Sequence, residues 1–520
     1  MSTISLHWLP FGAAMLSAFF SLEGIAFAQS PLSSISVPLP ANLNTYVKDR
    51  ASAIRLGKAL FWDQQAGGDG QIACASCHFQ AGADVRATNS LNPGKNGVFN
   101  SLTGAGGTLT PANFPIRTDD ICGSQGIVSC NFIALDPTDP LARDLNTPVN
   151  DGTFFPNRQV TGRNAPSTIM AAFMVDNFWD GRAKEIFNGV SPGGKNAAPA
   201  TILFNNLLGL APKQVAISPA STASQAVGPA NNPVEMSTKG RKFAQLGRKL
   251  IGRTPLALQV IASNDSVLSS VSQWPATGLS TTYAAMIRAA FQNNLHNSAT
   301  LTRDGFTQME SNFSLFWGLA ILLYEATLVP NQSPFDRWAA GNATAMTASQ
   351  IAGFDVFQGR GRCDKCHGGT TFSGATLVGG EGDPFANIGS SLTSQDPGRM
   401  PDALGEFMVP TLRNTELTGP YFHNGHYMTL RQVVDFYNRG GDFNNAEKHS
   451  QVRSLELTET EKVNLVAFLT ALTDDRVRYE RAPFDHPSLF LANSNPLPCV
   501  GATGLPVPVS TFLNADPQAR

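Results

Sequence analysis

Apolar side chains recur at helical spacing in several separate stretches of the chain. The pattern predicts helices at residues 240–251, 283–292, 305–328, 348–357, 430–437 and 458–472. The last stretch begins with a capping box, in which Thr458 can accept a hydrogen bond from the backbone N–H of Glu461 while the Glu461 side chain reaches back. Its broad apolar face consists of Val463, Leu465, Val466, Phe468 and Leu469.

Two long intervals lack this periodicity. The residues between His78 and Asn164 are rich in Gly, Pro, Asn and Thr, and a second interval of this kind covers residues 188–225. Such a composition predicts long ordered loops inserted between helices. No section is rich in strand patterns, so we expect the regular structure to be mainly α.

The start of the chain has the pattern of an export signal. An apolar stretch from Leu9 to Ala28 is interrupted by Glu23 and ends in Ala26-Phe27-Ala28, which resembles a signal-peptidase site. We therefore predict a signal peptide at residues 1–28 and a periplasmic mature protein. Because no Lys or Arg precedes the apolar stretch, an uncleaved N-terminal anchor is the alternative, and it also exports the protein.

A second apolar run, from Phe313 to Leu328, contains Ser314 and Glu325 and is followed by Pro330. These features are typical of a buried helix and not of a membrane span. We expect no transmembrane helix in the mature chain.

The length and the charge of the chain limit the number of domains and the kinds of binding partner that we expect. A chain of 520 residues can form two or three domains with cores of their own. The formal net charge is −2 and only 15% of the residues are charged, without an excess of Lys and Arg. Nothing global therefore indicates binding to nucleic acid or to an anionic membrane.

The cysteines carry the clearest chemistry. Four of the seven lie in Cys74-Ala-Ser-Cys77-His78 and Cys363-Asp-Lys-Cys366-His367. Two thiols on one helical turn can form thioethers to the vinyl groups of a haem, and the next His can then ligate the iron. Zinc knuckles rarely carry His after both pairs, and a redox C-x-x-C would not normally occur twice. The motifs predict two covalently bound haem c groups in a mainly α fold with two cytochrome c-like haem domains and long loop insertions.

The other cysteines are less informative. Cys122 and Cys130 lie close together in a Gly- and Ser-rich segment of a chain that we expect in an oxidising compartment, so we predict a local disulfide between them. Cys499 lies in a Pro-rich tail, and no function is evident for it.

From about residue 50 to about residue 490, the chain resembles the bacterial di-haem cytochrome c peroxidases, a superfamily that includes the MauG maturase. The matching blocks, in order, are Leu56–Asp63, Gly68–His78, Arg163–Pro166 with Phe178–Arg182, Gly228–Met236, Gly359–His367, and Pro410–Asn414 with Pro420–Gly425. The resemblance implies a peroxidatic haem domain at residues 29–330, an electron-transfer domain at 331–480, and a tail at 481–520 that packs back on the first domain.

Roles for individual residues also follow from the resemblance. His78 corresponds to the proximal ligand of the N-terminal haem, where peroxide reacts, and His367 to that of the electron-transferring haem. Glu235 matches the distal acid, Pro229 a steric wall beside it, and Trp179 the aromatic residue between the haems. The alternatives are a solvated loop glutamate for Glu235 and a core tryptophan for Trp179.

The resemblance further implies a structural calcium ion. Relatives hold it with an Asn side chain, backbone carbonyls and waters, which match Asn164, Thr418 and Pro420 here. One departure concerns the iron ligands: no histidine occurs between His78 and His296, whereas many relatives have one that ligates the resting peroxidatic haem. We therefore expect a five-coordinate haem that reacts without reductive activation.

A second departure concerns the sixth ligand of the C-terminal haem. Fourteen residues after the position of His423, peroxidases of this family carry Met, whereas the MauG maturase carries Tyr; this chain has Tyr437. The helical face that would deliver the phenol consists of Leu430, Val433, Val434 and Tyr437. The alternative is a core tyrosine, with Met428 or His426 as the ligand.

These observations predict an enzyme that reduces hydrogen peroxide with electrons from a small cytochrome or cupredoxin. One alternative is a MauG-like enzyme that oxidises a partner protein or an organic substrate, which Tyr437 favours. Another is a non-catalytic di-haem electron carrier, against which Glu235 argues because a carrier needs no distal acid.

Overall fold

The computed structural model describes residues 30–400 and 404–520, and the predicted signal peptide at 1–28 lies outside these residues. The helices are α1 (Arg50–Trp62), α2 (Ala75–His78), α3 (Ser221–Ala226), α4 (Phe243–Ile251), α5 (Tyr283–Ala290), α6 (Gln308–Ser311), α7 (Phe313–Glu325), α8 (Pro334–Ala339), α9 (Ala348–Gln358), α10 (Asp364–His367), α11 (Leu430–Asn438), α12 (Glu459–Thr470) and α13 (Asp475–Arg478).

The short strands form separate two-stranded antiparallel sheets, and in each sheet the two strands follow one another in the chain, β1 with β2, β3 with β4 and so on. They are β1 (Leu91–Asn92), β2 (Ile121–Cys122), β3 (Cys130–Leu135), β4 (Asp144–Pro148), β5 (Ile202–Asn206), β6 (Gly209–Lys213), β7 (Gly368–Gly369), β8 (Gly380–Glu381), β9 (Phe385–Ala386) and β10 (Phe407–Met408).

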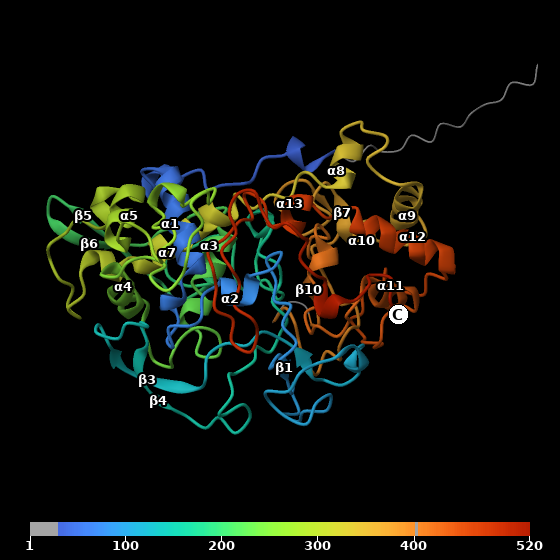
Figure 1. Cartoon of the computed structure of the whole chain (residues 1–520), viewed down its shortest axis with the longest axis horizontal. Helices are drawn as coiled ribbons and strands as arrows, with labels where there is room; N and C mark the ends of the chain where they lie inside the picture. The colour runs from blue at the N-terminus through green and yellow to red at the C-terminus, as the bar shows by residue number, and fades with distance from the viewer. Residues whose placement is uncertain (1–29, 401–403) are drawn as a thin grey trace, which may run out of the picture.

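The N-terminal half is built around α7, which is buried along its whole length. An apolar sequence of this kind has to be covered on every side. Helix α1 crosses α7 closely at Gly57, where an added Cβ would lie 2.0 Å from the carbonyl oxygen of Ala320. Helices α3 and α4 also contact α7, and α5 contacts α1, so these helices enclose it (Figure 1).

The C-terminal half has a separate cluster of buried side chains, between α9, α11 and α12. Gly353 allows α9 to approach α12, because a Cβ there would lie 1.9 Å from the carbonyl oxygen of Asn464. The aromatic members of this cluster include Phe335, Phe354, Phe357, Phe372 and Phe468. The two halves lie side by side (Figure 1).

Helices α4, α5, α9, α11 and α12 confirm five of the predicted helices, and the capping box of Thr458 and Glu461 is present. The predicted helix at 305–328 is instead two helices, α6 and α7, which meet at Asn312. The Asn312 side chain donates to the carbonyl oxygens of Leu203 and Leu295, contacts that an uninterrupted apolar helix would not make.

The prediction of mainly α structure is not confirmed, because helices, 3-10 turns included, make up 28% of the described residues and strands with isolated β-bridges make up 13%. Strands β1 to β4 lie in the first interval without periodicity, and β5 and β6 lie in the second. Such ladders satisfy backbone N–H and C=O groups within ordered loops. Strands as short as these leave no periodic pattern in the sequence.

The first long insertion, residues 85–160, contacts both halves. The backbone N–H of Ile116 donates to the carbonyl oxygen of His426 in the C-terminal half, at 2.9 Å. Near the other end, the buried carboxylate of Asp144 accepts from Arg241 and from Lys249 of α4, each at 2.9 Å. The insertion therefore ties the two halves together.

The predicted disulfide between Cys122 and Cys130 is wrong, because both thiols are free. Cys122 lies in β2 and Cys130 in β3, two strands that pair with different partners. Between them, Gln125 is bridged to Val160, so a third pairing holds the intervening segment.

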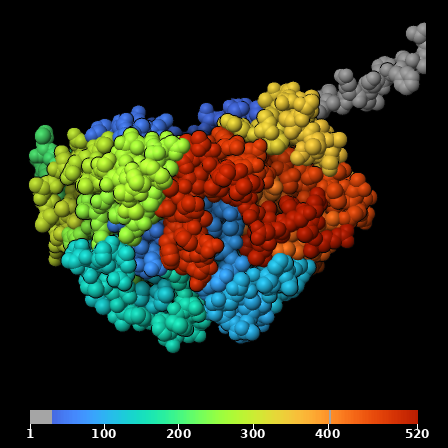
Figure 2. Space-filling view, viewed as in Figure 1, coloured from blue at the N-terminus to red at the C-terminus, as the bar shows by residue number. Residues whose placement is uncertain are grey.

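The tail lies against both halves. The ring of His486 stacks on that of Trp62 in α1, with 4.7 Å between the centroids. Nearer the C-terminus, the carbonyl oxygen of Pro517 accepts from the backbone N–H of Arg431 in α11. Figure 2 shows the red C-terminal segments lying across the middle of the molecule. In residues 30–400 and 404–520, no helix has the length and apolar character that a bilayer crossing requires.

Candidate functional site

Each half contains a cavity, and the two cavities share a wall. The N-terminal cavity lies between α2, the end of α7 and the segment around the 3-10 turn Pro229–Asn231. The C-terminal cavity lies between α10, α11 and residues 407–413. The side chains that line both are Asn164, Ala165, Pro166, Ser167, Ala171, Asn177 and Trp179.

The first C-x-x-C-H run forms α2, so Cys74, Cys77 and His78 all line the N-terminal cavity. The Nδ1 atom of His78 lies 2.8 Å from the carbonyl oxygen of Gly82, to which it can donate. Burial lowers the pKa of His78, which favours the neutral ring. A neutral imidazole whose Nδ1 is held by a carbonyl has its Nε2 lone pair available for a metal ion.

Glu235 lines the same cavity, together with Pro229. The side chain is half-buried, and burial raises the pKa of its carboxyl to about 6, although the nearby Arg182 guanidinium acts in the opposite direction. A carboxyl with a pKa near neutrality can both accept and return a proton at physiological pH. Glu235 and His78 thus line one cavity.

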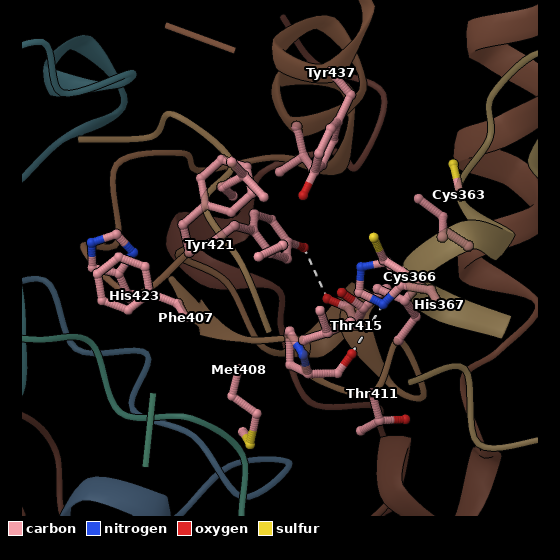
Figure 3. Close-up of a pocket in the computed structure, with 18 of the residues that line it drawn as sticks. Cys363, Cys366, His367, Phe407, Met408, Thr411, Thr415, Tyr421, His423 and Tyr437 are labelled. Atoms are coloured by element: carbon pink, nitrogen blue, oxygen red, sulfur yellow. Dashed lines mark hydrogen bonds between the residues drawn. The ribbon is translucent and has the colours of Figure 1, made fainter. Parts of the chain in front are cut away.

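The second C-x-x-C-H run forms α10, and Cys363, Cys366 and His367 line the C-terminal cavity (Figure 3). The Nδ1 atom of His367 lies 3.2 Å from the carbonyl oxygen of Phe372 and 3.1 Å from that of Pro410. Burial lowers the pKa of this ring to about 4. His367 is therefore a neutral ring with its Nε2 free of these contacts.

Tyr437 projects from α11 into the C-terminal cavity, and Figure 3 shows its hydroxyl pointing into the space beside Cys366 and His367. The other residues predicted for this helical face also line the cavity: Leu430, Val433 and Val434. Burial, and then the nearby thiols of Cys366 and Cys363, raise the pKa of Tyr437 well above its ordinary value. In the protein alone the phenol is therefore neutral.

The alternative ligands for this cavity lie elsewhere. The Nε2 atom of His426 is 2.8 Å from the carbonyl oxygen of Asp120, and Met428 is buried in a cluster with Phe512. Neither lines the cavity. Met408 does line it, and this methionine was not predicted from the sequence; in Figure 3 its sulfur points away from Tyr437 and His367.

Trp179 lies in the shared wall, and its indole N–H donates to the carbonyl oxygen of Asn164 at 2.8 Å. Its ring centroid is 6.4 Å from that of His423, and His423 in turn stacks on Phe407 at 3.5 Å. The rings of Trp179, His423 and Phe407 thus form a row that extends from the shared wall along the C-terminal cavity. Phe407 was not predicted as a site residue, although it lies only three positions before the Pro410 motif.

Asn164, Thr418 and Pro420, the residues predicted to hold calcium, all line the C-terminal cavity. The Asn164 side-chain amide donates to the carbonyl oxygen of Cys122, so its Oδ1 is the atom that could ligate an ion. Among the described residues, the cluster of side chains suited to a metal is Cys366, Asp383 and His449. We assign no metal there, because Cys366 belongs to the C-x-x-C-H motif.

The donor sets of both cavities fit covalently attached haem. In each, two thiols one helical turn apart precede a neutral histidine whose Nδ1 lies within hydrogen-bond distance of a backbone carbonyl oxygen. The C-terminal cavity has a largely apolar lining. The N-terminal cavity also contains Glu325, whose buried Oε2 has no hydrogen-bond partner in the described part of the chain. Glu325 was not predicted as a site residue, because in the sequence it is notable only as a charged residue within an apolar run.

Comparisons with known proteins agree with this chemistry. A family model described as di-haem cytochrome c peroxidase matches residues 51–344. Cytochrome-c peroxidase IdrP2 of Denitromonas iodatirespirans is 33% identical over 177 residues, which cover 29% of this chain and 47% of that protein. The chain thus spans about half of the length of that relative.

Two further relatives differ in the kind of enzyme they represent. Cytochrome c551 peroxidase of Nitrosomonas europaea is 25% identical over 482 residues, which cover 91% of this chain and 92% of the relative. Methylamine utilization protein MauG of Methylorubrum extorquens is 32% identical over 181 residues, which cover 34% of this chain and 48% of that protein.

Proposed function

Because the chain belongs to the di-haem cytochrome c peroxidase family, we propose that it reduces hydrogen peroxide to water with electrons from an external donor. The observation that carries the proposal is the cavity that combines His78 with the carboxyl of Glu235. In the balanced reaction, one peroxide molecule takes up two electrons and two protons and gives two water molecules. Residues 29–330 form the peroxidatic domain, and residues 331–480 form the electron-transfer domain.

When bound, the N-terminal haem supplies an iron that exchanges electrons with peroxide. Cys74 and Cys77 would attach this group, and His78 would ligate its iron through Nε2. Among the described residues that line the N-terminal cavity, His78 is the only histidine. The lack of a second histidine there supports the expectation that a bound haem would react with peroxide without prior reduction.

Glu235 moves the proton. Its carboxylate would accept a proton from one oxygen of peroxide and return that proton to the other oxygen, which leaves as water. The pKa of about 6 suits both steps near neutral pH. Pro229 forms part of the wall of this pocket and excludes bulkier molecules.

Cys363 and Cys366 would attach the second haem and His367 would ligate it, and this group would supply the entry point for electrons on the other side of the shared wall. Trp179 lies in that wall and lines both cavities, which supports its role as the intermediate group. A small cytochrome or cupredoxin is the donor. The mature protein is periplasmic after removal of residues 1–28.

Calcium is a proposed structural ion between the two cavities, bound by the Oδ1 of Asn164 and the backbone carbonyls of Thr418 and Pro420 with waters. Hard oxygen donors of this type suit Ca²⁺. Asn164 also supports the wall directly, since its carbonyl oxygen accepts from Trp179. Removal of the ion with a chelator is therefore expected to slow electron transfer between the cavities.

A MauG-like reaction, in which the oxidising equivalents attack a partner protein or an organic molecule, is the second candidate. The position of Tyr437 in the C-terminal cavity favours it. A phenolate oxygen stabilises ferric iron more than a thioether does, so this haem would have a low potential. Coordination to the iron would also lower the pKa of the phenol that burial otherwise raises.

Steady-state consumption of peroxide tests the proposal. The purified protein with both haems attached is mixed with peroxide, with and without a reduced small cytochrome or cupredoxin. Saturable consumption that requires the donor is expected. Consumption without the donor but with oxidation of an added protein or phenol would indicate the second candidate, and no consumption at all would leave an electron carrier.

A further inference from the structure

Glu325 is a second carboxyl in the N-terminal cavity. It is the last residue of α7 and lines the cavity wall, yet the residue is only 2% exposed. Its Oε2 atom is buried and has no hydrogen-bond partner among residues 30–400 and 404–520. Burial raises the pKa of Glu325 well above its ordinary value.

The elements packed against α7 offer no counter-charge to this carboxyl. Helix α3 and the 3-10 turn Ala171–Phe173 contain no ionisable side chain. The paired groups on the other neighbouring helices are Lys58 of α1 with Asp265 and Asp485, Arg248 of α4 with Glu310 of α6, and Lys249 of α4 with Asp144. Arg50 and Arg55 lie in the first half of α1, away from the buried Lys58 to Trp62 end.

Inside the cavity, Glu325 shares the space with Cys74, Cys77, His78 and Glu235. Arg163, Asp180 and Arg182 also line this cavity, and both guanidinium groups pair with the Asp180 carboxylate. The charge of Glu325 acts on Cys74, which places the carboxyl near the thiol that would attach the haem. Tyr324, the preceding residue, accepts a hydrogen bond from the indole of Trp62, so its hydroxyl is engaged elsewhere.

A buried carboxyl without a partner keeps its proton to a higher pH than an exposed one, because an isolated charge in an apolar setting is unfavourable. An electron added to the cavity makes loss of that proton harder still, and removal of an electron makes it easier. This coupling follows from electrostatics alone and requires no movement of the protein.

We propose that Glu325 is the proton site coupled to electron transfer in the N-terminal cavity, binding one proton as one electron enters and releasing it as one electron leaves. The inference rests on the proposed attachment of haem at Cys74 and Cys77. In the overall reaction, two electrons from the donor and two protons convert peroxide to water. Glu235 moves the proton of peroxide itself, and Glu325 balances the charge of an electron held at the iron.

Spectroelectrochemical titration of the protein with both haems attached tests this role. The midpoint potential of the N-terminal haem is measured from about pH 5 to about pH 9 for the wild type and for Glu325→Gln. In the wild type the potential should fall as pH rises, because ionised Glu325 stabilises the oxidised iron. The variant should coincide with the wild type at the acid end and have the higher potential at the alkaline end.

Two control variants separate this role from others. Tyr324→Phe removes a neighbouring buried hydroxyl and should retain the wild-type pH profile. Glu235→Gln should remove only the component of the profile near pH 6. A shift of equal size at every pH in Glu325→Gln would identify a purely structural residue and overturn the proposal, as would an unchanged profile.

A second measurement covers the case in which Glu325→Gln does not accumulate with haem. The infrared difference spectrum between the oxidised and reduced wild-type protein should contain a band of a protonated carboxyl that Glu325→Asp moves. Absence of such a band would overturn the proposal. Neither measurement requires peroxide turnover, so failure here is distinct from failure of the peroxidase proposal, which haem content and peroxide consumption test separately.

Discussion

Glu235 and Glu325 have different chemistry because their surroundings differ, although both line the N-terminal cavity. Burial raises the pKa of the half-buried Glu235 to about 6, while the nearby Arg182 guanidinium acts in the opposite direction. Glu325 is buried, its Oε2 has no hydrogen-bond partner among the described residues, and burial raises its pKa well above the ordinary value. Side chains of one type can therefore serve as a proton-transfer group and as a proton store.

Replacement of Glu235 tests the first of these roles. Glu235→Gln keeps the size of the side chain but removes the acid–base function, so reaction with peroxide should slow by roughly 100-fold in stopped-flow mixing. The wild-type rate should fall as pH decreases through about 6, since a protonated carboxyl cannot accept a proton, and the variant should lack this step. Glu310→Gln, a change outside the cavity, is the control. An unaltered rate with normal haem spectra would make Glu235 a bystander.

Tyr437 can be tested by spectroscopy. We expect the ferric wild-type protein to lack the weak near-infrared band of methionine ligation, and we expect Tyr437→Phe to change the spectrum of the C-terminal haem. Met428→Leu should leave that spectrum unchanged because Met428 lies outside the cavity. Met408→Leu should also leave it unchanged, because the Met408 sulfur points away from Tyr437 and His367 (Figure 3). A methionine band in the wild type, or a silent Tyr437→Phe, would contradict the assignment.

At the scale of elements, the short helices α2 and α10 are the units that present thiols and imidazole together. Each is a single turn, and this local geometry depends on the C-x-x-C-H spacing more than on distant contacts. In the same way, the capping box of α12 involves only Thr458 and the nearby Glu461. Features of this kind are predictable because their partners are close in sequence.

Removal of the two thiols from one C-x-x-C-H turn should remove one haem. The double variant Cys363→Ala and Cys366→Ala should retain a single covalent haem after acid–acetone extraction and lose donor-driven turnover. The free thiols of Cys122 and Cys130 provide a matched control, since their replacement by Ala should leave both haems attached. Normal donor-driven turnover in the first variant would refute the proposed division between the two cavities.

At the scale of the whole molecule, buried ion pairs join segments that are far apart in the sequence. Lys58 of α1 is fully buried and pairs with Asp265 at 2.8 Å and with Asp485 of the tail at 3.3 Å. Asp485 also accepts from the backbone N–H of Ser266 at 2.7 Å. These contacts hold the tail against the N-terminal half, beside the stacked rings of Trp62 and His486.

Asp485→Ala should therefore destabilise the protein, because it leaves Lys58 and the Ser266 N–H with fewer partners inside the core. We expect a loss of roughly 3 kcal/mol in the free energy of unfolding, measured by denaturant titration. Asp475→Ala, which removes an exposed carboxylate, should change the free energy by less than about 1 kcal/mol. Equal effects of the two changes would show that the tail is not held by this contact.

The sequence by itself determined the two C-x-x-C-H motifs and the approximate boundaries of helices such as α9 and α12. Both depend on short-range spacing. Only the tertiary structure decided the break between α6 and α7, the separation of Cys122 from Cys130, and the burial of Glu325 beside Cys74. Each depends on contacts between residues that are far apart in the sequence or on which strand a segment pairs with, and local patterns do not encode that choice.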